Sequence, residues 1–414
     1  MKPLESVRID ADWLAAKPLQ TLFDILGEDG GMAMVAGGAV RNALMQLPAT
    51  DVDLSTTVEP EAVIARLQAA GYKVVPTGLE HGTVTAIIED SVFEVTTLRE
   101  DIETDGRHAI VKFGTDWATD AKRRDLTMNG LFCDRDGHVY DFVEGYPDIQ
   151  TRNVRFIGEA ETRIREDALR ILRFFRFFAW YGEGRPDASG LKACNANKKL
   201  MSGLSVERVW MELRKMLSAP DPSRALLWMR TTGILGGVLP ETVGWGIDAI
   251  PGVIRNEQEY GWDADPMFRL MAMVRPHDET VKGLAERLLL SNADRDRLTK
   301  WARSQAPSHD INKDELAKHL YSGSQQGMID AMRLEVVHLQ NRDDETGSAH
   351  MAKLVDFAST WQKPIFPVKG QDLLDAGMTP GKAVGESLAE LETQCVESGF
   401  QISREELLPI HGKS

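Results

Sequence analysis

Two carboxylates spaced by two residues are the strongest candidates for chemistry in this sequence. Asp51 and Asp53 lie in the β-branched run DVDLSTT (51–57). In a β-strand alternate side chains face the same side of the sheet, so this spacing directs both carboxylates to one side. Two like charges held side by side are costly unless a cation lies between them. Mg²⁺ prefers such hard oxygen ligands together with substrate phosphates. The pair therefore predicts a magnesium site for phosphate chemistry.

A glycine pair precedes the carboxylates. Gly37 and Gly38 end the apolar run MAMVAGG (32–38), and a helix-like segment, AVRNALMQ (39–46), follows them. Glycine lets a phosphate approach the backbone, and a helix N-terminus favours an anion. Arg41, on the first turn of that helix, is expected to reach a triphosphate. A glycine pair or a pair of aspartates is common alone, but the two joined in this order form a much more specific pattern.

Glu94 is the candidate for a third carboxylate. It lies in the strand-like segment VFEVTTLR (92–99) between Phe93 and Val95. One interpretation is a strand residue that simply faces solvent. The functional interpretation makes Glu94 the group that activates an attacking 3′-hydroxyl beside the metal.

The elements that would position these residues change in character along the chain. Residues 31–100 predict strand, helix, strand, helix and then two strands, with the second helix over 59–72. This order indicates an α/β region. From about residue 150 the pattern is helical, with a long helix predicted over 159–181 and another over 206–217. The first part is therefore expected to carry the chemistry, and the rest to be an all-helical accessory region.

Composition limits the class of protein. The 414-residue chain carries a net charge of −15, which argues against non-specific coating of nucleic acid. Its three cysteines, Cys133, Cys194 and Cys395, form no C-x-x-C pair, so neither a disulfide framework nor a zinc–thiolate site is expected. A reducing, cytoplasmic location fits this cysteine usage. No segment is apolar enough to span a bilayer, and the N-terminal residues are typical of neither a secretory signal nor a transit peptide.

Five segments carry a resemblance to a known family. They are GGAVRN…DVDLSTT (37–57), HGTVTAIIEDSVFEVTTLRED (81–101), AKRRDLTMNGLF (121–132), DFVEGYPDIQTRNVRFIG (141–158) and IREDALRILRFFRF (164–177). In this order they resemble the successive motifs of the class II CCA-adding enzymes. That family includes bacterial poly(A) polymerases and belongs to the polymerase-β-like nucleotidyltransferases. Two positions depart from its pattern, because Asn42 stands where Asp is usual and Gly130 where Ala or Ser is usual.

The resemblance implies both an architecture and an activity. The fold would be α+β, with a polymerase-β-like palm (1–150), an all-helical neck (151–220) that selects the nucleotide, and a helical body and tail (221–414). The body and tail would bind tRNA, which the protein would contact at its 3′ end and elbow. The activity would be template-independent addition of CCA to tRNA from CTP and ATP. Two metal ions, taken as Mg²⁺ and held by Asp51 and Asp53, would assist phosphoryl transfer.

A charged turn is expected to bind the sugar and phosphates. In RRDLTMNG (123–130), Arg124 could hold the triphosphate, while Asp125 and Asn129 could bind the ribose hydroxyls. Taken alone, the same residues would suit a solvated charged turn. The family resemblance favours the nucleotide-binding interpretation.

The long predicted helix carries residues expected to read the base. Asp167, Arg170 and Arg173 are spaced by three and are expected to share one face, with Arg176 one turn further on. Glu166 and Arg170 could instead form an ordinary i, i+4 salt bridge. In the functional interpretation the carboxylate accepts from the amino group of C or A, and the guanidinium of Arg170 donates to the ring nitrogen beside it.

One segment separates full CCA addition from its alternatives. REDIETDGRHAIVKFG (99–114) is predicted to be a polar loop. By resemblance it corresponds to the flexible loop that CCA-adding enzymes possess and CC-only enzymes lack. Three other functions remain open, namely a poly(A) polymerase of the same family, a CC-only enzyme, and a non-catalytic RNA-binding protein on the same scaffold.

Overall fold

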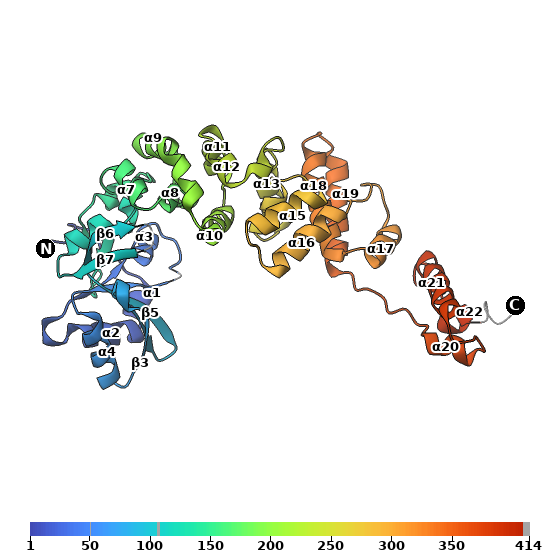
Figure 1. Ribbon diagram of the computed structural model, residues 1–414, viewed down its shortest axis with the longest axis horizontal. Helices are drawn as coiled ribbons and strands as arrows, with labels where there is room; N and C mark the ends of the chain where they lie inside the picture. Colours follow the sequence, from blue (N-terminus) through green and yellow to red (C-terminus); the bar gives the residue numbers. More distant parts are fainter. Residues whose placement is uncertain (50, 106–107, 409–414) are drawn as a thin grey trace. The chain divides into compact units, whose positions relative to one another are not determined.

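The chain forms two compact units. The computed structural model describes residues 1–49, 51–105 and 108–408. One unit comprises Met1–Val238 and the other Leu239–Ser414. Figure 1 colours the chain from blue at the N-terminus to red at the C-terminus. The first unit contains the sheet and all of the predicted site residues.

A mixed seven-stranded sheet forms the centre of the first unit. Its strand order is β3-β4-β5-β2-β1-β8-β9. Neighbouring strands are antiparallel except β2 and β5, which are parallel. The strands are Ala33–Ala36 (β1), Leu54–Thr56 (β2), Lys73–Gly78 (β3), Thr83–Ile88 (β4), Ser91–Thr97 (β5), Leu131–Cys133 (β8) and Val139–Asp141 (β9). This sheet, followed by helices to the end of the described chain, confirms the predicted α+β class.

One face of the sheet is covered by two helices. α2 (Lys17–Gly27) packs against β1 and β4, and α4 (Pro60–Ala69) packs against β3 and β4. α4 confirms the helix predicted over 59–72. It begins at Pro60, where the missing N–H has no partner to lose, and Gly71 beyond its end has a φ of 83°. β4 and β5 alternate buried and more accessible side chains, so their other face is left for the site.

Helices make up most of the rest of the first unit. α10 forms over the residues predicted for it. Besides α2 and α4, the helices are α1 (Asp12–Ala15), α3 (Gly38–Leu44), α5 (Trp117–Arg123), α6 (Gly145–Gln150), α7 (Ala160–Glu166), α8 (Leu169–Tyr181), α9 (Ala188–Asn197), α10 (Val206–Leu217), α11 (Ser223–Thr231) and α12 (Ile234–Val238).

The single helix predicted over 159–181 is wrong, because the chain forms two helices there. α7 ends at Glu166 and α8 begins at Leu169. Between them Asp167 has an extended backbone with φ −151° and ψ 108°. Its carboxylate accepts a hydrogen bond from the N–H of Leu169 at 3.0 Å. A side chain that satisfies an N–H at a helix start competes with a continuous helix, and the unbroken apolar stripe concealed this break.

The segment 99–114, predicted to be a loop, contains two paired strands instead. β6 (Arg99–Asp105) and β7 (His108–Phe113) form a separate antiparallel pair with a register shift between Asp101 and Glu103. The run from His108 to Phe113 contains β-branched and aromatic residues, which favour a strand. Residues 106 and 107 of the predicted loop lie outside the described residues. The flexibility that the resemblance implies stays a prediction.

All secondary structure in the described residues of the second unit is helical. α18 and α19 pack side by side and bury Met332 and Leu354, whereas Leu373 and Leu391 centre a separate cluster around α20 to α22. Among the residues that the structure describes, no helix has the length and apolar character needed to cross a membrane. The helices are α13 (Ile250–Tyr260), α14 (Pro266–Met271), α15 (Asp278–Arg287), α16 (Asn292–Arg303), α17 (Lys313–Ser322), α18 (Gln325–Gln340), α19 (Glu345–Thr360), α20 (Gly370–Asp375), α21 (Lys382–Glu397) and α22 (Arg404–Leu407).

Candidate active site

A pocket of about 690 Å³ lies in the first unit, beside the open face of the sheet. It is walled by β2 and β5, by the start of α3, by the turn after α5 and by α8. The predicted site residues line it, except for Asp51 and Arg176. Those in the wall are Gly37, Gly38, Arg41, Asp53, Glu94, Arg124, Asp125, Asn129, Asp167, Arg170 and Arg173.

The sheet brings two of the three predicted carboxylates together. β2 begins at Leu54, so Asp51 and Asp53 precede the strand, and the prediction that they lie within it is wrong. Leu54 pairs with Val95 in parallel register, which places Asp53 beside Glu94. Both carboxylates are exposed in the pocket wall, on the side of the sheet opposite the buried Leu54 and Val95.

The electrostatics of Asp53 reflect a cluster of like charges. Partial burial raises the pKa of Asp53 to about 6, and the negative charges of Glu94 and Asp51 contribute to that rise, against a lowering effect of Arg124. The side chain keeps contact with solvent, so its hydration is only partly removed. An arrangement of this kind is relieved by a cation, and carboxylate oxygens are suitable ligands for a hard divalent ion.

The glycine pair lies between two guanidinium groups. Gly37 has a φ of 70°, a conformation that favours glycine. A Cβ at this position would lie 3.3 Å from Nη1 of Arg124, and one at Gly38 would lie 3.8 Å from Nη2 of Arg41. Arg124 donates from Nη2 to Ser55 Oγ and to Asp120, at 3.0 Å each. Because neither glycine has a side chain, the backbone is accessible where the guanidinium groups of Arg124 and Arg41 approach it.

Arg41 is held by polar and aromatic groups from α3, from the turn after α5 and from α8. Its Nε and Nη2 donate to Oδ1 of Asn42 at 3.1 and 2.8 Å, and its Nη1 donates to Oδ1 of Asn129 at 2.5 Å. Nη2 also donates to the hydroxyl of Tyr181 at 2.8 Å. The guanidinium stacks on the Tyr181 ring at 4.1 Å and near the Phe177 ring at 5.2 Å. These contacts tie α3 to α8.

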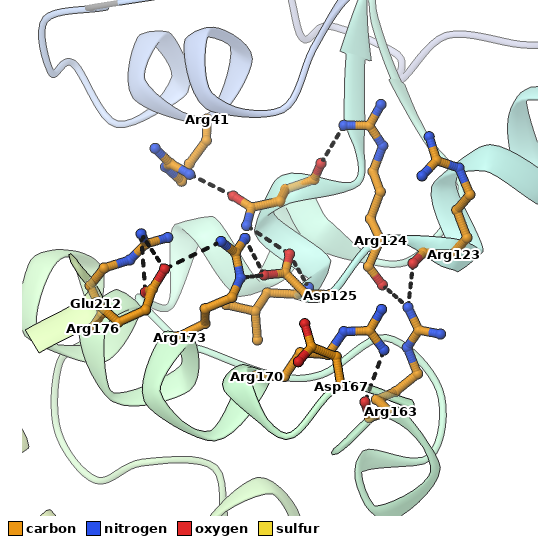
Figure 2. A network of polar contacts seen from close by, with 12 residues as sticks. Arg41, Arg123, Arg124, Asp125, Arg163, Asp167, Arg170, Arg173, Arg176 and Glu212 are labelled. Atoms are coloured by element: carbon orange, nitrogen blue, oxygen red, sulfur yellow. Dashed lines mark hydrogen bonds and ion pairs between the residues drawn. The ribbon is translucent and has the colours of Figure 1, made fainter. Parts of the chain in front are cut away.

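The turn after α5 forms a bonded network rather than a solvated turn, as Figure 2 shows. Asp125 accepts from the amide of Asn129 at 3.1 Å and pairs with Nη2 of Arg173 at 2.5 Å. Burial alone would raise the pKa of Asp125, but Arg173 and the Asn129 amide outweigh it and lower the value to about 2. Asp125 is therefore fixed as an ionised acceptor between the turn and α8.

Asp167 and Arg170 both line the pocket, although the break before α8 means that they do not share a helix face as predicted. Asp167 pairs with Nη2 of Arg208 on α10 at 2.6 Å. Arg170 pairs through Nη1 with Glu166 at 2.5 Å, and the same atom donates to the carbonyl of Arg163 at 2.9 Å. The Glu166–Arg170 salt bridge considered from the sequence is thus present. It lies at the pocket wall rather than on a remote surface.

Arg176 lies outside the pocket wall and faces α10. It pairs with Glu212 at 3.2 Å, and the Glu212 side chain is only 2% exposed. Sequence reasoning missed both Glu212, which pairs with Arg176 of α8, and Arg208, which pairs with Asp167 just before α8. Their spacing of four within VERVWMELRKML puts them on one helix face and was the available signal. Sequence reasoning also missed Asp120, which pairs with both Arg123 and Arg124.

A second group of possible metal ligands lies at the turn between β8 and β9. Within the described residues, ligand atoms of Asp134, Asp136 and His138 lie within 4.8 Å of one another. The Asp134 carboxylate already accepts from the backbone N–H groups of Asp136 and His138 at 3.0 and 2.9 Å. The group therefore has donor atoms that a metal can use, and it also stabilises the turn.

Family models match two stretches of the chain. A model described as "Poly A polymerase head domain" matches residues 33–155, which include the sheet and the charged turn. A model described as "Probable RNA and SrmB- binding site of polymerase A" matches residues 187–244.

Curated proteins are similar over half to nearly all of the chain. The protein named CCA tRNA nucleotidyltransferase 1, mitochondrial, from Danio rerio is 36% identical over 384 residues, which cover 90% of this chain and 85% of that protein. Its Mus musculus counterpart is 34% identical over 403 residues, with coverage of 95% and 90%. A CCA-adding enzyme from Geobacillus stearothermophilus is 39% identical over 222 residues, or 53% of each chain.

Solved structures share the fold. The CCA-adding enzyme of Bacillus stearothermophilus in complex with CTP superposes with a TM-score of 0.74 at 26% identity, covering 95% of this chain and 97% of that one. The Thermotoga maritima CCA-adding enzyme complexed with tRNA gives a TM-score of 0.68 at 18% identity, with 98% of both chains covered. At that identity the second likeness concerns the fold alone.

Proposed function

This chain belongs to the family of class II CCA-adding enzymes and poly(A) polymerases, and from that premise we propose that it completes the 3′ end of tRNA with CCA. The substrates are CTP and ATP, the attacking group is the tRNA 3′-hydroxyl, and pyrophosphate leaves. The observation that carries the proposal is one pocket that combines carboxylates, a bare glycine backbone and paired arginines. These are the groups that nucleotidyl transfer requires.

Asp51 and Asp53 are proposed to hold Mg²⁺, with Glu94 beside them. The cluster fits a divalent cation, because Glu94 and Asp51 both add to the raised pKa of Asp53 and positive charge would relieve that repulsion. When bound, the metal supplies a lowered pKa for the 3′-hydroxyl and neutralises charge on the triphosphate. Glu94 would accept the hydroxyl proton.

The nucleotide is proposed to lie along the glycine pair and the charged turn. Gly37 and Gly38 let phosphate oxygens approach the backbone, and Arg41 and Arg124 flank them with positive charge. Asp125 and Asn129 would bind the ribose hydroxyls, since both are fixed by their contacts before a substrate arrives. Arg173 and Arg176 would hold Asp125 and α8 in place.

Asp167 and Arg170 are proposed to select the base. Cytosine presents N4 beside N3, and adenine presents N6 beside N1, so each offers an amino donor next to a ring acceptor. The Asp167 carboxylate accepts from the amino group, and the Arg170 guanidinium donates to the ring nitrogen. Uracil and guanine reverse this order. A carboxylate accepts several bonds, so the observed bond to Arg208 leaves acceptor capacity for a base.

The helical part is proposed to bind tRNA by shape and phosphate contacts. The division into palm (1–150), neck (151–220) and body with tail (221–414) is kept as a proposal. The acidic net charge of −15 suits a reader of one folded RNA better than a non-specific RNA binder. The cytoplasmic location also stays a prediction, and the mitochondrial names of the vertebrate relatives are the reason to test it.

The decisive experiment is extension of a tRNA that lacks CCA. Purified protein is incubated with Mg²⁺ and with CTP, ATP or both, and the products are separated at single-nucleotide resolution. We expect CC from CTP alone, and one added A once ATP is present. Repeated addition of A to tRNA and to single-stranded RNA alike would indicate a poly(A) polymerase. Arrest after CC would indicate a CC-only enzyme, and no extension would favour the non-catalytic alternative.

A further inference from the structure

Arg41 differs from other arginines of the pocket in the charge of its partners. Five of those arginines face a carboxylate within ion-pair distance, namely Arg123 and Arg124 with Asp120, Arg170 with Glu166, Arg173 with Asp125 and Arg208 with Asp167. Arg41 donates instead to Asn42, Asn129 and Tyr181, all of them neutral. In the part of the chain that the structure describes, Arg41 forms no ion pair with a carboxylate.

The guanidinium of Arg41 is nevertheless buried. The residue is 6% exposed and lies against the rings of Phe177 and Tyr181. Its hydrogen bonds use four of the five N–H donors that a guanidinium carries. Neutral acceptors satisfy the N–H groups without forming an ion pair, and burial lowers the pKa of Arg41 although the charge of Asp125 partly opposes this effect. A buried cation in this state gains when an anion arrives.

The position of that charge points to one class of anion. Nη2 of Arg41 lies 3.8 Å from where a Cβ of Gly38 would be, so the guanidinium is beside the glycine pair. The same wall carries Arg124, whose Nη1 lies 3.3 Å from the corresponding point at Gly37. A chain of phosphates lying along the two glycines would meet both cations. Because Arg124 already faces Asp120, Arg41 brings the less neutralised charge.

Asn42 supplies one of the neutral acceptors of Arg41. Its Oδ1 accepts two N–H bonds from Arg41, and its Nδ2 donates to the carbonyl of Pro48 at 2.8 Å. The carbonyl can only accept, so this bond determines which way the amide faces. A carboxylate at position 42 would lose the bond to Pro48 and would place a negative charge against Arg41.

We propose that Asn42 sets triphosphate affinity through its lack of charge, because it gives Arg41 a neutral acceptor beside the glycine pair and leaves the charge of Arg41 for the substrate. The inference rests on the proposed function. It concerns how strongly the pocket binds the phosphates of any nucleoside triphosphate. It does not concern which base is chosen, which is assigned to Asp167 and Arg170.

The test compares two substitutions that both remove the bond to Pro48 and differ in charge. Asn42→Asp supplies Arg41 with a counter-ion, and Asn42→Leu does not. Dissociation constants are measured for ATP, CTP and inorganic tripolyphosphate on the full chain with Mg²⁺ at low salt and without tRNA. Thermal midpoints are measured on the same proteins. Asn195→Asp is the matched control, since it adds one charge at an exposed position of α9 outside the pocket wall.

The expected result is an inverted ranking. Asn42→Asp should have the higher thermal midpoint of the two variants, because its buried cation is paired. It should also bind all three ligands about tenfold more weakly than the wild type, whereas Asn42→Leu stays within about threefold, where tenfold corresponds to about 1.4 kcal/mol. With CCA-less tRNA the Asp variant should show a raised KM and little change in kcat.

Two results would overturn the inference. One is equal ligand affinity in Asn42→Asp and Asn42→Leu, and the other is a lower thermal midpoint for the Asp variant than for the Leu variant. Failure of the proposed function is separate from either, because it would appear as a wild-type protein that binds nucleotides but does not extend tRNA.

Discussion

The two units bury arginine–carboxylate pairs in different ways. In the second unit Arg269 and Glu257 are 1% and 6% exposed and are joined by bonds of 3.0 Å from Nε and 2.5 Å from Nη2. In the first unit Arg173 and Asp125 are 31% and 10% exposed, and both line the pocket. The closed pair has no access to a substrate, whereas the open pair can reach one. The same type of ion pair thus stabilises the fold in the second unit and is accessible to a ligand in the first.

Breaking the closed pair should have the largest effect on stability. Arg269→Met leaves the Glu257 carboxylate buried without its main partner, which costs about 3–5 kcal/mol of unfolding free energy. Chemical denaturation of wild type and variant measures this loss. Nucleotide affinity of the first unit should not change. A loss of less than about 1 kcal/mol would show that Glu257 finds water or another partner.

Arg173→Met is the matched substitution in the open pair. Its cost to stability should be smaller, because the guanidinium is partly hydrated and Asp125 keeps its bond to Asn129. Unlike Arg269→Met, it should weaken nucleotide binding, since Asp125 loses the partner that orients it. A larger stability loss than for Arg269→Met, with nucleotide affinity intact, would remove the distinction between the two pairs.

Asp53→Ala addresses the carboxylates of the same pocket. The rates of adding C and of adding A should both fall by at least about a hundredfold, or about 2.7 kcal/mol of transition-state stabilisation. Binding of CCA-less tRNA should stay largely unchanged, because the metal serves chemistry more than docking. Single-turnover rates and a filter-binding assay measure the two quantities. A variant that retains more than about a hundredth of the wild-type rate contradicts the assignment of the metal to Asp53.

Sequence patterns were most informative where one short segment carries the signal. The glycine pair, Asp53 and Glu94 each belong to a strand or its end, and the alternation along β5 puts Glu94 opposite the buried Phe93 and Val95. Local spacing of this kind fixes which side of a strand a residue faces. The pocket position of Glu94 agrees with this alternation, whereas Asp53 precedes β2 and reaches the pocket wall from outside the strand.

Long-range contacts were not readable in the same way. Arg41 meets Tyr181, 140 residues later, and Arg173 meets Asp125, 48 residues earlier. No local period encodes such pairs, since they depend on how α8 lies beside α3 and the turn after α5. The break at Asp167 was readable in principle, because an aspartate just before a helical run is a common helix start.

Asp167→Ala tests base selection within the open pocket. Removing the carboxylate should relax selection, so that UTP or GTP use rises relative to CTP and ATP. Each mismatch that the wild type rejects costs roughly 1–3 kcal/mol, because buried polar groups are left unpaired. Measuring kcat/KM for all four nucleotides on CCA-less tRNA gives the ratios. A uniform loss of activity with unchanged ratios would assign Asp167 to its salt bridge with Arg208 instead.

The smallest effect is expected from an arginine that neighbours the site only in sequence. Arg165 lies on α7 between Arg163 and Asp167, but its side chain is 66% exposed and pairs with Glu161, itself 55% exposed, at 2.7 Å. An exposed i, i+4 pair contributes about 0.3–0.5 kcal/mol, since water screens it. Arg165→Ala should therefore lower stability by no more than that and leave kcat/KM for CTP and ATP within about twofold, a difference of less than about 0.5 kcal/mol.

Arg163, two residues earlier, is 12% exposed and donates to the backbone carbonyls of Arg123 and Arg124, so position on the helix rather than charge decides which arginine matters. A loss of more than about fivefold for Arg165→Ala on tRNA, with free-nucleotide affinity unchanged, would extend the functional surface beyond the pocket to the exposed side of α7.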